Sequence, residues 1–158
     1  MKLYVMRHGP AEDVAPSGRD FDRALTTAGR ARVKQVAELL AKHDEAPKAI
    51  LASPLARALQ TAEIVANVVN LEPAVAVRRE IAPSGDMQTL VDELLGVSAR
   101  RVMLVGHEPD VSALVHAFVP SWDAPLEKAM VVGLRVRANE VPELRFVLEP
   151  KTLAWKSS

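Results

Sequence analysis

The sequence contains no cysteine, which excludes disulfide bonds, thiolate nucleophiles and cysteine-ligated zinc sites. Aromatic residues make up only 4% of the 158 residues, so a core must consist mainly of Val, Leu, Ile and Ala. Neither sign of charge is in excess, because 20 basic residues balance 20 acidic ones. Since no global field favours nucleic acid or an anionic membrane surface as a partner, any anion site must be local.

Long apolar runs are missing as well. The first apolar stretch is broken by Arg7 and is shorter than the core of a signal peptide, and no stretch approaches the length that spans a membrane. These features predict a cytoplasmic protein that does not associate with membranes. Hydrophobic residues make up 49% of the chain, which is enough for one sizeable core and predicts a single domain over residues 1–158.

Segments of strand length alternate with segments of helical periodicity along the chain, which predicts an α/β domain. Thr26 is expected to cap the first helix, and Ser53 and Pro54 are expected to be the N-cap and first residue of the second. A turn at 83–86 leads into a third helix. Strands are expected at 2–6, 48–52, 74–77, 102–105, 130–136 and 144–148, the last two as a closing hairpin at an edge, and helices at 26–42, 53–67, around 90–95 and at 109–118.

Chemically reactive residues follow three of the predicted strands directly. The first strand ends in Arg7-His8-Gly9, the second leads into Ser53-Pro54 with Arg57 in the first helical turn, and the fourth ends in Gly106-His107. Parallel strands of an open α/β sheet place their carboxyl ends on one edge, where ligands bind. Two arginines and two histidines are therefore expected in one crevice beside helix amino termini, which themselves attract anions.

This set of side chains is typical of a phosphoryl-transfer site. Two guanidinium groups can hold phosphate oxygens through charge-assisted hydrogen bonds and keep their charge at any physiological pH. One imidazole can accept a phosphoryl group, and a second, protonated imidazole can donate to the phosphoryl oxygens. The predicted reaction is two in-line displacements through a phosphohistidine, with no metal or cofactor required.

These residues resemble the signature of a known family. Arg7-His8-Gly9, the segment Ser53-Pro54-Leu55-x-Arg57-x-x-x-Thr61 and Gly106-His107 are similar to the motifs of the histidine phosphatase superfamily, which includes phosphoglycerate mutases. Within it the chain resembles the SixA-type phosphohistidine phosphatases, with further matches at 23–29 and 83–86. The resemblance implies a three-layer α/β/α fold with a mainly parallel central sheet, as in phosphoglycerate mutases.

The resemblance also implies roles for individual residues. His8 would be the nucleophile, Arg7 and Arg57 would bind the phosphate, and His107 would be the second catalytic and phosphate-binding histidine. Glu80 follows the third strand, where relatives carry a general acid, and it is the candidate for that role, with Asp86 in reserve. Where many superfamily members have an acidic or amide residue and then Thr or Ser, this chain has Pro10-Ala11, which makes mutase activity less favoured.

The sequence excludes two classes of enzyme and leaves several functions open. A P-loop enzyme is excluded because the glycine-rich loop ending in Gly-Lys-Ser/Thr is absent, and His107-Glu108 lacks the second histidine of a helical zinc motif. The loops at 10–22 and 81–86 are too short to form a sizeable lid, which favours a phosphorylated protein, such as a histidine phosphotransfer domain, as the substrate and inorganic phosphate as the product. The alternatives are a phosphatase for a small phosphate ester and a non-catalytic module that binds phosphohistidine.

Overall fold

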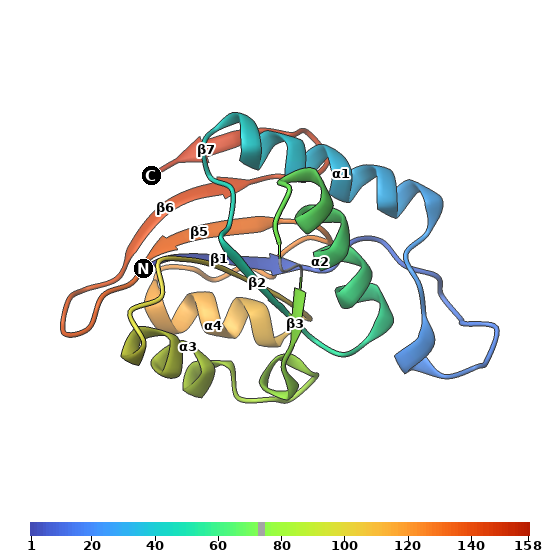
Figure 1. Ribbon diagram of the computed structural model, residues 1–158, viewed down its shortest axis with the longest axis horizontal. Helices are drawn as coiled ribbons and strands as arrows, with labels where there is room; N and C mark the ends of the chain where they lie inside the picture. The colour runs from blue at the N-terminus through green and yellow to red at the C-terminus, as the bar shows by residue number, and fades with distance from the viewer. Residues whose placement is uncertain (73–74) are drawn as a thin grey trace.

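In a computed structural model that describes residues 1–72 and 75–158, the protein consists of a seven-stranded sheet with helices on both faces (Figure 1). The strand order is β3-β2-β4-β1-β5-β6-β7. The strands are β1 (Lys2–Arg7), β2 (Ala49–Ala52), β3 (Val75–Val77), β4 (Arg101–Gly106), β5 (Val131–Arg135), β6 (Glu143–Leu148) and β7 (Trp155–Ser157). The helices are α1 (Thr27–Lys42), α2 (Ala56–Val68), α3 (Met87–Gly96) and α4 (Asp110–Phe118), with short 3-10 helices η1 (Asp20–Asp22) and η2 (Arg79–Ile81).

The predicted α/β fold with a parallel central core is confirmed. Strands β3, β2, β4 and β1 pair with one another in parallel, whereas β5, β6 and β7 extend the sheet in antiparallel order from β1. The predicted pairing of the last two long strands is present, but β7 pairs with β6, so the edge strand is one that the sequence did not predict. Residue 74, where the third strand was expected to begin, lies outside the described residues.

Each face of the sheet carries its own hydrophobic core. Figure 1 shows α1 and α2 on one face and α3 and α4 on the other. Tyr4 and Met6 of β1 pack with α1 and α2, while Leu3 and Val5 of the same strand pack with α3 and α4. This alternation follows from the two-residue period of a strand that is buried on both faces. The central strands are therefore held rigidly between two layers, and so are the residues that follow them.

The first two helices begin differently from one another. Thr26 is the N-cap of α1 as predicted, because its side chain accepts a hydrogen bond from the Gly29 amide. The prediction for Ser53 and Pro54 was wrong, because Leu55 is the N-cap of α2 and the helix starts at Ala56. The Ser53 hydroxyl oxygen accepts a hydrogen bond from the Leu55 amide before the helix begins. The proton of the hydroxyl group is therefore free to go to a residue of a neighbouring strand.

A buried carboxylate joins three elements at the amino ends of the parallel strands. Glu45, which follows α1, accepts hydrogen bonds from the Tyr4 hydroxyl at 2.7 Å and from the guanidinium of Arg145 on β6, and Lys2 lies 3.4 Å away. Burial raises the pKa of Glu45, but the hydrogen bonds from Arg145 and Tyr4 outweigh it and hold the pKa at about 2. Glu45 is thus a charged tie between the α1–β2 connection and the sheet.

The aromatic residues near the carboxyl terminus of the chain form a stack. The Trp155 ring on β7 lies 4.0 Å from the Phe146 ring and 3.9 Å from the His43 ring, measured between centroids. This contact fastens the edge strand to the end of α1. In residues 1–72 and 75–158, no helix is both long and apolar enough to cross a membrane.

Candidate active site

The two predicted catalytic histidines follow adjacent parallel strands. Arg7 at the end of β1 is in register with Gly106 at the end of β4, and the His8 amide donates to the Gly106 carbonyl at 3.0 Å. The His8 and His107 rings come to lie 5.2 Å apart between centroids, tilted by 53°. Both side chains are buried, with 6% and 4% of their surface exposed. The topology thus brings together two imidazoles that are 99 positions apart.

Gly9 is required by close packing where the chain leaves β1. A Cβ atom at this position would lie 2.5 Å from Cγ2 of Val33 on α1, which is closer than such atoms approach. The Gly9 amide donates to the Thr61 hydroxyl at 3.0 Å, and that hydroxyl donates to the Arg57 carbonyl one turn earlier in α2 at 2.7 Å. Thr61 therefore holds the turn after His8 against the helix that carries Arg57. The sequence motif contained Thr61, but no role was predicted for it.

The hydrogen bond of His8 determines which of its nitrogen atoms can react. Nδ1 lies 2.7 Å from the Gly9 carbonyl oxygen, which can only accept, so Nδ1 carries the proton. Burial lowers the pKa of His8 to about 3. The Gly9 hydrogen bond opposes this shift, and the nearby His107, Arg57 and Arg7 add smaller downward effects. The ring is therefore neutral at physiological pH. A neutral ring protonated on Nδ1 has its lone pair on Nε2, which is the nucleophilic atom.

His107 is held by a residue of the neighbouring strand. Its Nε2 lies 2.7 Å from Oγ of Ser53, a side chain that is fully buried beyond the end of β2. Because the Ser53 oxygen already accepts from Leu55, its own proton can go to Nε2 of a neutral His107. That arrangement leaves the proton of His107 on Nδ1. Burial first, and then the charge of Arg57, lower the pKa of His107 to about 4.

Both arginines of the site are anchored by main-chain carbonyl groups. Arg7 donates to the Leu126 carbonyl at 2.9 Å, and Arg57 donates to the Asp20 carbonyl at 2.9 Å. Arg57 also pairs with the Asp20 carboxylate at 3.2 Å, an arrangement made by η1 in the loop at 10–22. The sequence did not identify Asp20 or the carbonyl of Leu126, because neither lies in a recognisable motif.

Three buried nitrogen atoms of the site have no hydrogen-bond partner. They are Nε of Arg7, Nε of Arg57 and Nδ1 of His107. Within residues 1–72 and 75–158, no other buried side-chain nitrogen or oxygen lacks a hydrogen-bond partner. Buried polar groups are normally paired, because an unpaired one costs about 1 to 3 kcal/mol. All three are able to donate, and they come from the residues predicted to bind phosphate. Together they fit an acceptor-rich anion.

The two candidate acids lie elsewhere in this region and are engaged with other groups. Glu80 on η2 accepts from Arg78 at 3.0 Å, and this hydrogen bond lowers its pKa. Asp86 is the N-cap of α3 and accepts from the amide and hydroxyl of Thr89, which lowers its pKa. Neither carboxylate is hydrogen-bonded to the histidines or arginines of the site. Among the described ranges, no group of three or more His, Asp or Glu side chains forms a metal-ligand set.

Comparison with known proteins identifies the family of the chain. The sequence profile of the histidine phosphatase superfamily (branch 1) matches residues 3–82, about half of the chain. An uncharacterized protein of Picosynechococcus sp. is 37% identical over 97% of this chain and 99% of its own length. The phosphohistidine phosphatase SixA of Escherichia coli is 34% identical over 80% of this chain and 79% of its own length.

The likeness extends to the whole fold. A solved structure of the protein histidine phosphatase SixA, complexed with tungstate, superimposes with a TM-score of 0.88 and covers 98% of this chain and 100% of its own, at 26% identity. The fold and the family expected from the sequence motifs are both confirmed. The chain belongs to the histidine phosphatase superfamily, a membership that indicates a phosphatase hydrolase.

Proposed function

We propose that the protein removes the phosphoryl group from a phosphohistidine of another protein, through a covalent phosphohistidine intermediate on His8. The observation that carries the proposal is the set of three buried, unpaired donors on Arg7, Arg57 and His107. A phosphoryl group offers three oxygen atoms that accept hydrogen bonds. It would satisfy these donors while its phosphorus faces the free Nε2 atom of His8.

In the first step, Nε2 of His8 attacks the phosphorus atom. A bond forms between His8 and phosphorus while the bond between phosphorus and the nitrogen of the substrate histidine breaks. The two guanidinium groups and Nδ1–H of His107 hold the phosphoryl oxygens and offset their negative charge. The leaving imidazole takes its electron pair with it and receives a proton from water or from the general acid. The Gly9 carbonyl keeps the His8 ring oriented throughout.

In the second step, a water molecule attacks the phosphohistidine. The phosphorus–nitrogen bond to His8 breaks, and inorganic phosphate leaves with the oxygen of that water. Proton transfer from the water restores the starting protonation state of the site. No metal ion is needed for either step, because arginine and histidine donors stabilise the charge. Metal independence is therefore a prediction for assay in the presence of a chelator.

The proposed substrate is a histidine phosphotransfer domain in cytoplasmic signalling. The relatives named SixA are described as phosphohistidine phosphatases, and one was solved with tungstate, an oxyanion. The loop at 10–22 is short, and its Asp20 carbonyl accepts from Arg57. A loop of this length is too short to be a sizeable lid, which favours a protein-borne imidazole as the substrate. Glu80 is the proposed general acid, with Asp86 in reserve. An imidazole departs from phosphorus with less protonation than an alkoxide, so this acid matters little for phosphohistidine.

The test compares a phosphohistidine-bearing phosphotransfer domain with a panel of small phosphate esters, all with a chelator present. We expect turnover of the protein substrate, none in His8→Ala, and acid-quenched phosphate on residue 8. Activity confined to sugar phosphates would support the second candidate, a small-molecule phosphatase of the same superfamily. Binding of phosphohistidine without turnover by the intact protein would establish the non-catalytic module instead. Phosphate trapped only on His107 would reverse the roles of the two histidines.

A further inference from the structure

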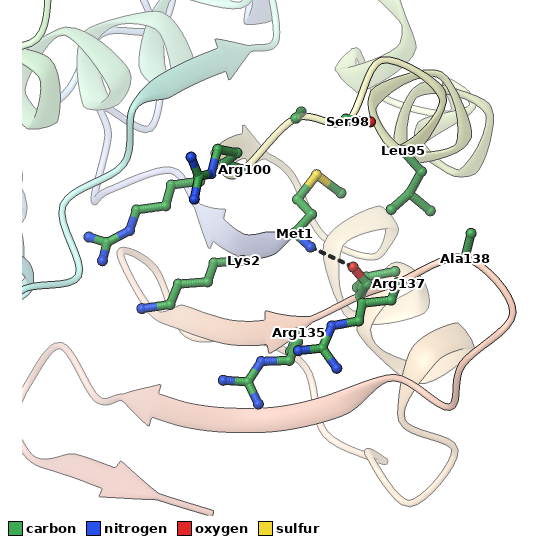
Figure 2. Close-up of a pocket in the computed structure, with 11 residues that line it drawn as sticks. Met1, Lys2, Leu95, Ser98, Arg100, Arg135, Arg137 and Ala138 are labelled. Atoms are coloured by element: carbon green, nitrogen blue, oxygen red, sulfur yellow. Dashed lines mark hydrogen bonds between the residues drawn. The ribbon is translucent and has the colours of Figure 1, made fainter.

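A second, strongly basic hollow lies at the opposite edge of the sheet from the candidate active site. It has a volume of about 550 Å³ and is lined by residues at the amino ends of β1 and β4, the end of β5 and the α3–β4 connection. Figure 2 shows Lys2, Arg100, Arg135 and Arg137 around it. Because β1 runs from Lys2 to Arg7, the hollow is about 20 Å from His8.

The cations of the hollow include a row across three neighbouring strands. Lys2 on β1 is directly opposite Arg101 on β4 and directly opposite Arg135 on β5. Like charges placed directly opposite each other on adjacent strands destabilise a sheet. Arg137 lies two positions beyond Arg135, past the end of β5, and Figure 2 shows the two side chains close to each other on the same side. The fold thus accepts a repulsion that a bound anion would relieve.

The carboxylates around the hollow compensate for only part of this charge. Among the residues that the structure describes, no carboxylate lies within ion-pairing distance of Arg100. Glu45 is shared between Lys2, Arg145 and Tyr4. The remaining pairs are at the surface, where an ion pair contributes little and the carboxylate can swing away. They join Arg135 to Glu143 at 3.1 Å, Arg137 to Glu140 at 2.9 Å and Arg101 to Asp44 at 3.8 Å.

The shape and walls of the hollow point to a small ligand. Its volume lies within the range of small-molecule sites. One wall is apolar and is formed by Leu95, Val136 and Ala138. The Met1 amine lines the same hollow and donates to the Val136 carbonyl at 2.8 Å, so one of its protons is already engaged. We propose that this hollow binds a small molecule that carries a diphosphate or triphosphate group, with the cations on the phosphates and the apolar wall against the rest of the ligand.

This second site is independent of the proposed reaction and can be tested apart from it. The probes are inorganic pyrophosphate and ADP, titrated by calorimetry into His8→Ala so that hydrolysis cannot consume them. We expect both to bind, more weakly as ionic strength rises. The double substitution Arg135→Gln and Arg137→Gln in this background should weaken binding by about tenfold or more, because two charge-assisted hydrogen-bonding groups are removed. Orthophosphate should bind more weakly than pyrophosphate, since it cannot bridge the separated cations.

Matched variants identify the site. Arg30→Gln with Lys34→Gln removes two positive charges from the exposed face of α1 and should leave binding unchanged. Arg100→Gln, which breaks no ion pair of the described residues, should also weaken binding and guards against misfolding of the double variant. The proposal is overturned if neither probe binds, if the Arg135 and Arg137 substitutions have no effect, or if only Arg57→Gln abolishes binding, which would place the probe on the candidate active site.

Discussion

The hydroxyl oxygen of Ser53 lies 2.7 Å from Nε2 of His107, and this contact joins the end of β2 to the end of β4. It occupies one nitrogen of the ring and leaves the other, the buried and unpaired Nδ1, as the atom that can meet a phosphoryl oxygen. The second histidine of the candidate site is therefore oriented by a residue that the sequence suggested as a helix cap.

Ser53→Ala should lower kcat by roughly tenfold or more with a smaller change in KM. The substitution leaves Nε2 of His107 buried without a partner and removes the group that orients the ring, at a cost of about 1 to 3 kcal/mol. Steady-state kinetics on the phosphohistidine substrate measures the effect. Ser17→Ala, in the exposed loop, is the control. An unchanged kcat for Ser53→Ala would show that the contact does not position His107 for catalysis.

Asp20→Asn should tighten the binding of inorganic phosphate by roughly threefold to tenfold. The Asp20 carboxylate sits 3.2 Å from the Arg57 guanidinium and competes with a phosphate for its charge. Product inhibition by phosphate is the measurement. Asp22→Asn is the matched control, because the Asp22 carboxylate accepts from Ser17 and does not contact Arg57. Weaker inhibition in Asp20→Asn would mean that the carboxylate supports the anion site by holding Arg57 in place.

Glu80→Gln should affect substrates unequally. We expect near-normal turnover of phosphohistidine, whose leaving group needs little protonation, and a loss of about 100-fold on an alkyl phosphate. The comparison variant is Asp86→Asn, which should keep both activities because asparagine also caps a helix well. If Asp86→Asn instead causes the selective loss on the alkyl phosphate, Asp86 is the acid. Equal losses on both substrates would point to a structural effect.

The free energy of unfolding should fall as the pH is lowered from about 6.5 towards 4. The pKa of His8 is about 3 and that of His107 about 4, whereas both rise to the ordinary value of 6.5 on unfolding. Between these values the unfolded chain binds protons that the native protein does not, so acid favours unfolding by on the order of 1 to 2 kcal/mol per histidine at about pH 5. Urea denaturation measures this. In His8→Gln, the free energy of unfolding should depend less steeply on pH than in the unaltered protein. An equally steep dependence would contradict the lowered pKa of His8.

Glu45→Gln should destabilise the protein by on the order of 2 to 4 kcal/mol, because it leaves the charge of Arg145 without its buried partner. Thermal or urea unfolding measures the loss. Glu143→Gln breaks the exposed pair with Arg135 and should cost less than about 1 kcal/mol. A similar loss of unfolding free energy in the two variants would mean that the burial of Glu45 adds nothing to the stability that its ion pair contributes.

Local patterns were sufficient for most of the secondary structure. The α1 helix runs from Thr27 to Lys42 as its periodicity predicts, and β4 adds one residue at each end to the predicted 102–105. The start of α2 and the existence of β7 were missed for different reasons. Ser53 has two possible partners, a helix end and a histidine of another strand, and sequence shows only the first. The three residues of β7 are too few for a periodic pattern, and they form a strand because β6 offers an edge.

The sequence by itself determined the α/β class, the family and the residues that gather at the carboxyl edge. Arg7, His8 and His107 lie at or next to the end of a strand, and Arg57 lies in the first turn of the helix that follows one, each in a motif of fixed spacing. Only the tertiary structure decided how these residues are held. The partners Ser53 for His107, Thr61 for Gly9 and Asp20 for Arg57 are 37 to 54 positions away. The row of Arg101, Lys2 and Arg135 likewise exists only through strand register. Local sequence sets which groups are present, whereas hydrogen-bond partners depend on the packing of distant segments, which no local pattern encodes.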